Sequence, residues 1–208
     1  MRLRASDVRP VDSQQIALRC PECHKTTIPI PIGQDWTIGE GYICGQRRCP
    51  DPQCNGHVFI VLTKGEVVAS YPPSRAEFNP ESIPNAVRKS FEEALDCHAH
   101  GYNVAAAIMI RRTLEDVCHD RDAKGDDLKA RIGDLRTKIV IPQELLDGMD
   151  ELRILGNDAA HVNAIAFLSI TKIELDVAIQ FTAELLKSLY QYSSLLQKLR
   201  ALKAQGSA

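Results

Sequence analysis

The residues Cys20-Pro-Glu-Cys23 and Cys49-Pro-Asp-Pro-Gln-Cys54 decide the fold of the first part of this chain. Paired thiols at this short spacing suit Zn²⁺, which is held by four soft or borderline ligands in tetrahedral structural sites. The small and turn-forming residues around each pair allow backbone amides to point at the sulfur atoms. We therefore predict a structural zinc site whose ligands are Cys20, Cys23, Cys49 and Cys54.

Two further residues are alternative ligands for the second half of this site. Cys44 lies five residues before Cys49, and His57 lies three residues after Cys54, so either could replace one of the four cysteines. We prefer Cys49 and Cys54 because the sequence around them indicates a tight turn, whereas Cys44 ends a strand-like run. Unligated core cysteines or disulfides are the remaining interpretation.

Composition and charge narrow the classes to which the protein can belong. Seven cysteines, an odd number, do not suit a disulfide framework, and no apolar segment typical of a signal peptide follows Met1-Arg-Leu-Arg. We therefore expect a cytoplasmic protein. The longest wholly apolar run, residues 104–110, is far shorter than the ~20 residues that cross a bilayer, so we expect no membrane association.

The charge of the chain bears on its partners. A formal net charge of −2 gives no support for nucleic-acid binding through bulk charge, so any such binding must come from a local patch. Arg47 and Arg48 lie beside the second cysteine pair and could contact a phosphate backbone. Two arginines in a neutral module are, however, more often solvated.

Prolines divide the chain into two parts of different composition. Short β-type runs such as Val58-Phe-Ile-Val-Leu alternate with the cysteine pairs and glycine-containing turns up to residue 70. Residues 71–83 are proline-rich and predict a linker. From Pro84 onward apolar residues recur at helical spacing. We predict a mainly α protein, in which a small β-rich module of zinc-ribbon type at 1–70 precedes a helical bundle at 84–208.

The first two helices of this bundle have clear boundaries in the sequence. One runs from near Pro84 to His100 and stops at Gly101, a residue suited to the position after a helix. Asn103 can then cap a second helix over residues 104–119. This helix is apolar on every side up to Ile110, which is the pattern of a helix buried at the centre of a bundle.

Three more helical segments follow. The third starts near Asp126 or Asp127, and the fourth begins at Pro142, a residue suited to the first turn. The last opens with the capping-box pattern of residues 171–174 and extends to about Ala204. Its apolar face continues beyond the expected end of the bundle. We interpret this face as a partner or dimer surface, with a frayed tail as the alternative; its residues are Leu195, Leu196, Leu199 and Leu202.

The fourth segment holds a row of polar side chains. If it stays helical across Gly156, then Arg153, Asn157 and His161 stand at i, i+4 and i+8 along one ridge. A glycine inside a helix costs about 1 kcal/mol relative to alanine, which indicates a packing or functional reason for it. If Gly156 instead ends the helix, the row is broken and the three side chains need not converge.

A second polar pair lies on the helix at 104–119. Arg111 and Glu115 stand one turn apart on an otherwise apolar face, where a buried pair of charges must be satisfied. The pair is either a structural salt bridge or part of a site with the ridge. An arginine beside a histidine suits phosphodiester chemistry, because the guanidinium stabilises negative charge while the imidazole moves a proton. The same groups would also bind a nucleotide phosphate without cleaving it.

Two runs carry a resemblance to a known family. They are Ala105-Ala-Ala-Ile-Met-Ile-Arg-Arg-Thr-Leu-Glu115 and Leu152-Arg-Ile-Leu-Gly-Asn-Asp-Ala-Ala-His161. Together they resemble a bacterial domain-of-unknown-function family placed among the HEPN-like (higher eukaryotes and prokaryotes nucleotide-binding) helical domains, over residues 82–190. The resemblance implies a helical bundle that forms homodimers through its helices, and a metal-independent endoribonuclease of a toxin, phage-defence or RNA-processing system acting on RNA.

The catalytic motif of that family is matched only in part. His161 matches its histidine, and Asn157 stands where a polar residue often precedes it. Arg153 is separated from His161 by seven residues, a longer gap than the family's motif has. Arg111 or Arg112 could supply the guanidinium instead. This departure makes a non-catalytic nucleotide-binding, adaptor or dimerisation domain, stabilised by structural zinc, the alternative.

Overall fold

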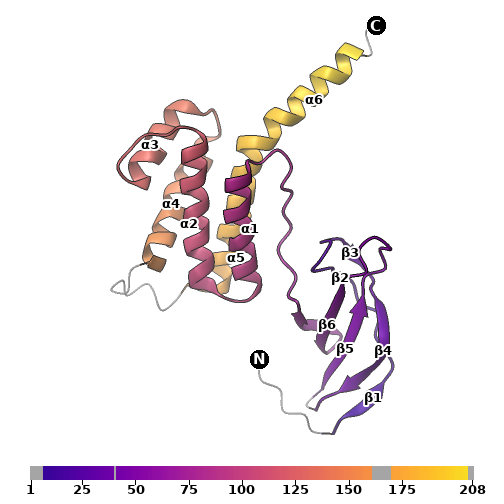
Figure 1. Cartoon of the computed structure of the whole chain (residues 1–208). Coiled ribbons are helices and arrows are strands. Elements are labelled where there is room, and N and C mark those ends of the chain that lie inside the picture. Colours follow the sequence, from indigo (N-terminus) through magenta and orange to yellow (C-terminus); the bar gives the residue numbers. More distant parts are fainter. Residues whose placement is uncertain (1–6, 40, 161–169, 206–208) are drawn as a thin grey trace. The chain divides into compact units, whose positions relative to one another are not determined.

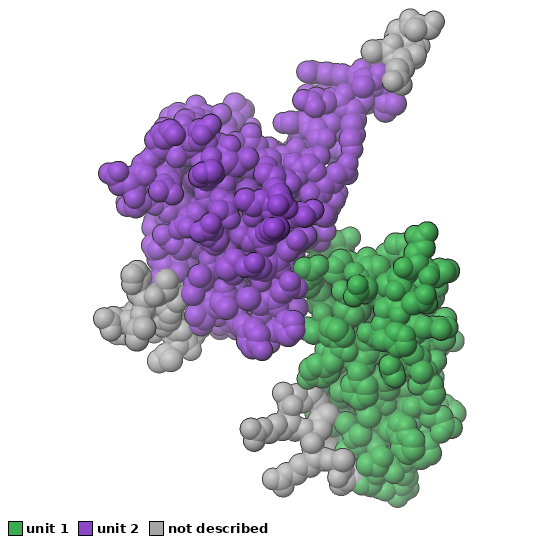
Figure 2. Space-filling model, in the orientation of Figure 1, with its two compact units in different colours: residues 1–77 green, residues 78–208 purple. Residues whose placement is uncertain are grey.

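The computed structural model describes residues 7–39, 41–160 and 170–205 (Figure 1). The chain divides into two compact units, residues 1–77 and residues 78–208 (Figure 2). The first unit holds the strands and is called the β-rich unit below. The second holds the helices and is called the helical unit. The prediction of a mainly α protein with a small β-rich part is confirmed.

An antiparallel sheet forms the framework of the β-rich unit. Its strand order is β1 (Arg9–Val11), β4 (Ile30–Thr37), β5 (Tyr42–Arg48), β6 (His57–Thr63) and β7 (Glu66–Tyr71). Strands β2 (Leu18–Arg19) and β3 (Thr26–Thr27) pair separately as a two-stranded ribbon. The β6–β7 hairpin turns at Lys64 and Gly65, whose φ angles of 52° and 81° match a two-residue turn that favours glycine.

One face of this sheet is covered and carries the core of the unit. Val58, Ile60 and Leu62 on β6 are buried there, because alternate residues of a strand point to the same side. Arg47 on β5 pairs with Val58 in the sheet and lies on this face too. The opposite face is open at Phe59 of the same strand, which is 43% exposed, whereas Val61 further along that face is buried.

Arg47 and Asp35 form an ion pair buried within the β-rich unit. Both side chains are 1% exposed, and the guanidinium donates two hydrogen bonds of 2.6 Å to the carboxylate oxygens. Arg47 also donates to the carbonyl of Gln14 at 3.2 Å. Gly45 leaves room for the pair, since a Cβ there would lie 1.9 Å from Asp35 Oδ1. The expectation of a solvated Arg47 is therefore wrong, because Asp35 and the Gln14 carbonyl satisfy its charge inside the unit.

Helix α2 (Asn103–Asp120) occupies the centre of the helical unit. It contacts α1 (Asn85–Ala99), α3 (Leu128–Lys138), α4 (Gln143–Ala160) and α5 (Lys172–Leu186) (Figure 1). Its inward residues are fully buried; they are Ala106, Ala107, Ile110, Thr113, Leu114, Val117 and Cys118. The predicted position of this helix at the centre of the bundle is confirmed, although Val104 and Ile108 are 41% and 37% exposed.

The helix ends follow local capping signals. The Asp127 carboxylate accepts from the Ala130 amide at 2.7 Å at the start of α3, and Thr171 with Glu174 forms the predicted capping box of α5. Gly101 follows α1 with a φ of 76°. Asn103 does not cap α2 as predicted. It is the first residue of the helix, and its side-chain amide donates to the carbonyl of Ile170 at 3.0 Å.

The last helix leaves the bundle after an irregular turn. Helix α5 continues through a π-helical segment, η2 (Lys187–Gln191), into α6 (Tyr192–Gln205) (Figure 1). The irregular turn is held by α2, because the Tyr190 hydroxyl donates to Asp120 at 2.9 Å. The Arg121 guanidinium also lies 4.5 Å from the centre of the Tyr190 ring. Among the described residues, no helix is long and apolar enough to cross a bilayer.

Candidate metal centre and polar cluster

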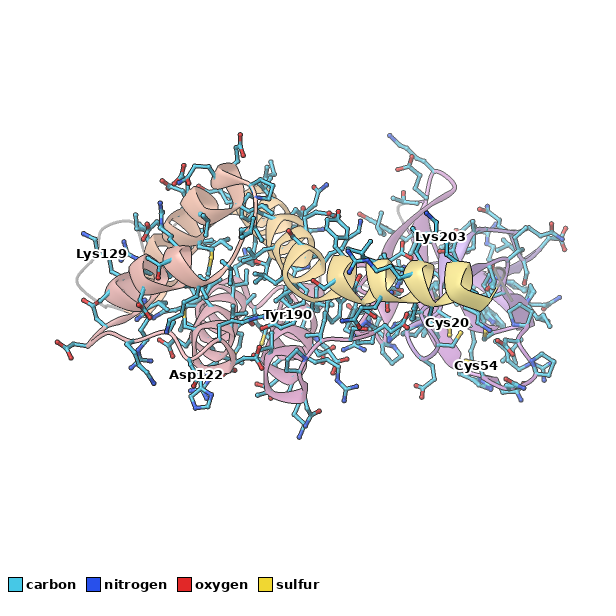
Figure 3. The ribbon with its side chains drawn as sticks, turned by 90° about the horizontal axis from the view of Figure 1, so that it is seen from above. Cys20, Cys54, Asp122, Lys129, Tyr190 and Lys203 are labelled. Carbon is cyan, nitrogen blue, oxygen red and sulfur yellow. The ribbon has the colours of Figure 1, made fainter. Side chains whose placement is uncertain are left out.

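Four cysteine sulfurs meet at one end of the β-rich unit. Cys20 and Cys23 lie in the turn between β2 and β3, whereas Cys49 and Cys54 lie in the connection between β5 and β6. All four Sγ atoms lie within 4.8 Å of one another. The Sγ atoms of Cys20 and Cys54 are 3.6 Å apart, and those of Cys23 and Cys49 are 3.8 Å apart (Figure 3 labels Cys20 and Cys54).

This spacing fits Zn²⁺ and excludes disulfides. A tetrahedron with Zn–S bonds of about 2.3 Å has S···S edges of about 3.8 Å, close to the two distances between the sulfurs. A disulfide would need about 2.05 Å, and all seven cysteines are free. The donor set therefore has the size and chemistry of a closed, four-thiolate metal site.

The two turns that contain the cysteine pairs share one backbone feature. The residue after the second cysteine has a positive φ in both turns, 59° at His24 and 49° at Asn55. In the second turn the Gly56 amide donates to the Cys54 sulfur at 3.3 Å. A Cβ on Gly56 would lie 3.2 Å from the sulfurs of both Cys54 and Cys20. Glycine is thus the residue that lets the two turns close around their sulfurs.

The thiols influence one another's ionisation. The pKa of Cys23 is lowered, chiefly by a hydrogen bond from the backbone of Lys25. Burial raises the pKa of Cys49. The Gly56 amide lowers the pKa of Cys54, yet burial and the neighbouring thiols together raise it to about 12. Four adjacent thiolates would repel one another, and a bound dication would offset that repulsion.

The two alternative ligands lie outside this cluster. Cys44 is within β5, opposite Trp36 and Val61 in the sheet, and its pKa is raised by burial and then by Asp35. His57 begins β6, and its Nδ1 lies 3.1 Å from the side-chain nitrogen of Gln46. The described residues thus bring together the two cysteine pairs preferred from the sequence.

In the helical unit, Arg111 of α2 meets α4 at Gly156. A Cβ on Gly156 would lie 2.4 Å from the Cβ of Arg111, so glycine is what allows the two helices to approach. Helix α4 continues past Gly156 to Ala160. Arg153 and Asn157 therefore lie on one continuous helix, as the unbroken ridge requires. His161 lies outside the described residues.

The arginines of this region are engaged by carboxylates. Arg153 donates to Asp150 at 3.1 Å, and Arg112 lies 3.3 Å from Asp116. The sequence prediction did not include these acidic partners, Asp150 and Asp116. Their i, i+3 and i, i+4 spacing from the two arginines nevertheless favours such pairs. The Arg112 side chain is 60% exposed, away from the buried side of α2 that carries its core residues. Arg112 therefore does not join Arg111 at Gly156.

Arg111 and Glu115 form the expected pair at 3.4 Å, but it is not buried. Their side chains are 24% and 32% exposed because they lie at the edge of the contact between α2 and α4. Only one terminal nitrogen of Arg111 takes part in the pair. The other, Nη1, is buried and has no hydrogen-bond partner among the described residues. This cluster therefore retains an unused donor.

Comparison with known proteins assigns the helical unit. A family model described as a domain of unknown function (DUF4145) matches residues 92–204. The match begins within α1 and ends within α6, and the four cysteines lie outside it. No curated protein and no solved structure match the chain.

Proposed function

The chain belongs to the DUF4145 family of domains of unknown function, and from this premise we propose a nucleic-acid-associated protein in which a zinc-stabilised binding module precedes a HEPN-like helical domain. The observation that carries the proposal is the cluster of four sulfurs within 4.8 Å. The zinc is structural, because four thiolate ligands leave no open position for a substrate. The β-rich unit then binds a partner instead of performing catalysis.

The small size of its core explains why the β-rich unit needs a metal. Its buried apolar cluster consists of Val58, Ile60 and Leu62, with a few partly buried neighbours. Small units with such cores depend on disulfides or metals for stability. Zinc held by Cys20, Cys23, Cys49 and Cys54 would join the β2–β3 ribbon to the β5–β6 connection. It would thereby link two segments that the sheet hydrogen bonds do not connect.

Metal content is the first test of this module. Elemental analysis of the full chain is expected to give one zinc per chain. Chelation is expected to unfold the β-rich unit and to leave the helical signal in circular dichroism. Cys23→Ser should lose the metal, whereas Cys44→Ser, the matched change of a thiol outside the cluster, should retain it. A full chain free of zinc, with unfolding insensitive to chelator, would contradict the proposal.

The helical unit supports contact with phosphate. Arg111, whose Cβ and Cδ lie against Gly156 of α4, has a buried Nη1 with no hydrogen-bond partner among the described residues, and a phosphate oxygen that reached it would be a fitting acceptor. Arg153 and Asn157 belong to the same stretch of α4. We therefore expect the full chain to bind RNA in fluorescence anisotropy, with affinity falling as salt is added. No binding at low salt would remove the nucleic-acid part of the proposal.

A metal-independent endoribonuclease of a defence or toxin system is the second candidate, favoured by the same Arg111 donor, which has no partner in the part of the chain that the structure describes. Arg111 would stabilise the negative charge on the phosphate, and Glu115 would orient the Arg111 guanidinium. His161 would transfer the proton during cleavage. Arg153 and Asn157 would contact the substrate beside them, and the exposed Arg112 would contact the RNA strand only outside this cluster. Against catalysis, Arg153 and Arg112 are already paired with carboxylates. A non-catalytic role in binding nucleotides or in dimerisation does not require these two arginines to leave their carboxylate partners.

Cleavage of a mixed RNA pool in EDTA separates these candidates, once circular dichroism shows that chelation leaves the helical unit folded. Cleavage that is lost in His161→Ala and in Arg111→Ala establishes the enzyme. Lys129→Ala, a change of an exposed cation on α3, is the matched control and should leave cleavage unchanged. The absence of cleavage in the presence of RNA binding assigns the non-catalytic role.

A further inference from the structure

The open face of the sheet in the β-rich unit carries two transverse rows of side chains. The first row crosses four strands, because Ile32 pairs with Gln46, Gln46 with Phe59, and Phe59 with Tyr71. The second row runs from Ile30 through Arg48 to His57. Residues that pair in an antiparallel sheet point to the same side. We define the open face as these two rows together with Trp36 of β4.

The apolar members of this face are exposed to a degree that a core does not show. Trp36, Phe59 and Tyr71 are 42%, 43% and 55% exposed, and Ile30 and Ile32 are 42% and 38% exposed. The other side of the same strands holds the buried core. Large apolar groups gathered on one exposed surface mark an interaction site.

The polar members of the open face specify the kind of partner. Arg48 and His57 lie side by side in the second row, and Gln46 lies within 3.1 Å of the His57 ring. None of the residues of the two rows is acidic. Aromatic rings that stack on bases, a guanidinium for phosphate and an amide for base edges are the groups that bind unpaired nucleotides.

We propose that the open face of the sheet binds single-stranded nucleic acid. Bases stack on Trp36, Phe59 and Tyr71, while Arg48 contacts the phosphate backbone. A duplex does not fit this mode, because its bases are stacked inside the helix and present no free faces. The inference rests on the proposed nucleic-acid association and deepens it by naming the surface and the form of the strand.

Trp36 supplies a direct reporter, since it is the only tryptophan of the chain. Single-stranded RNA and DNA oligonucleotides of one sequence, and the duplex of that sequence, are titrated into the full chain. The single strands are expected to quench tryptophan fluorescence and the duplex is not. A comparison of RNA with DNA shows whether the 2′-hydroxyl contributes to binding.

Variants of the open face test the contacts one by one. Phe59→Ala and Tyr71→Ala are each expected to weaken binding by about tenfold. Arg48→Ala is expected to reduce the dependence of log affinity on log salt by about one. Tyr102→Ala is the matched control, because Tyr102 is an aromatic residue of the helical unit that is 62% exposed. Zinc content and circular dichroism confirm that each variant is folded.

The outcomes separate this inference from the proposed function. Full-strength binding by Phe59→Ala and Tyr71→Ala, without a change in Trp36 fluorescence, overturns the open face as the site and leaves nucleic-acid association standing. Equal quenching by the duplex overturns the preference for single strands. The absence of binding to any oligonucleotide overturns both proposals. The apolar face would then be assigned to the binding of a protein partner.

Discussion

Gly56 is the residue on which the closure of the four-cysteine cluster depends. Its missing side chain leaves room for the sulfurs of Cys20 and Cys54 and for the Cβ of Glu22, which would lie only 2.8 Å from an added Cβ. Its amide donates to the Cys54 sulfur, a contact that favours the thiolate over the thiol. One small residue thus serves both the packing and the charge of the site.

Gly56→Ala is therefore expected to destabilise the β-rich unit by about 1–3 kcal/mol, the usual cost of forcing atoms into a packed site. Competition with a chelator should show weaker zinc binding, and thermal unfolding should show a lower midpoint for this unit. Gly133→Ala is the control, because a Cβ at that position in α3 meets nothing within 4 Å. Equal zinc affinity in Gly56→Ala and in the unchanged chain would refute this view of the turn.

At this scale the sequence predicts contacts between near neighbours and misses distant ones. The cysteine pairs were recognisable because their members lie a few residues apart. The burial of Arg47 was not, because it depends on Asp35 and on the Gln14 carbonyl, 12 and 33 positions away. The role of Gly156 was likewise open, since only the approach of Arg111 from another helix explains it.

At the scale of elements, the start of α5 links helix stability to pH. The Thr171 amide and hydroxyl both donate to the Glu174 carboxylate, at 2.7 and 2.8 Å. These bonds, the backbone bond first, hold the pKa of Glu174 below its ordinary value of 4.5. A lowered pKa in the folded state means that the stabilisation is fully present above the ordinary value and is lost as pH falls through the folded one.

Glu174→Gln is accordingly expected to lower the thermal midpoint of the helical unit at neutral pH. The difference in thermal midpoint between the variant and the unchanged chain should shrink as pH falls below 4.5. Protonation of Glu174 in the unchanged chain then removes the charge that the variant lacks. Glu184→Gln is the control, since Glu184 pairs at the surface with Lys187 and caps nothing. A gap that stays constant across this pH range would show that the capping carboxylate contributes nothing to stability.

The boundaries of the helices were largely predictable, and the irregular turn between α5 and α6 was not. Asp127, Thr171 and Gly101 act within one turn of the helix ends that they mark, so their effect is local. The η2 segment instead lies where Tyr190 contacts Asp120 and Arg121, which are 70 and 69 positions away in the sequence. Helical periodicity contains no signal for such a distant contact.

At the scale of the whole molecule, we propose that α6 provides the surface of a homodimer. Leu195, Leu196, Leu199 and Leu202 are 47–67% exposed along one side of this helix. We expect Leu195→Glu combined with Leu199→Glu to convert a dimer into a monomer in sedimentation velocity, because burial of the leucines drives association. Gln197→Glu, on the opposite side of α6, should leave the dimer intact. A full chain that sediments as a monomer at high concentration would refute the dimer.

The π-helical turn places one extra residue between the bundle and these leucines. A π-helical turn holds one residue more than an α-helical turn, and each residue of an α-helix adds about 100° of rotation. A π-helical turn therefore absorbs one inserted residue, and deleting one residue within Lys187–Gln191 would remove the irregular turn while leaving the leucine stripe of α6 at nearly its present angle about the helix. In an unbroken α-helix the same deletion would turn the stripe by about 100°, so the irregular turn is the place where this helix tolerates a change of length without moving the surface proposed for the homodimer.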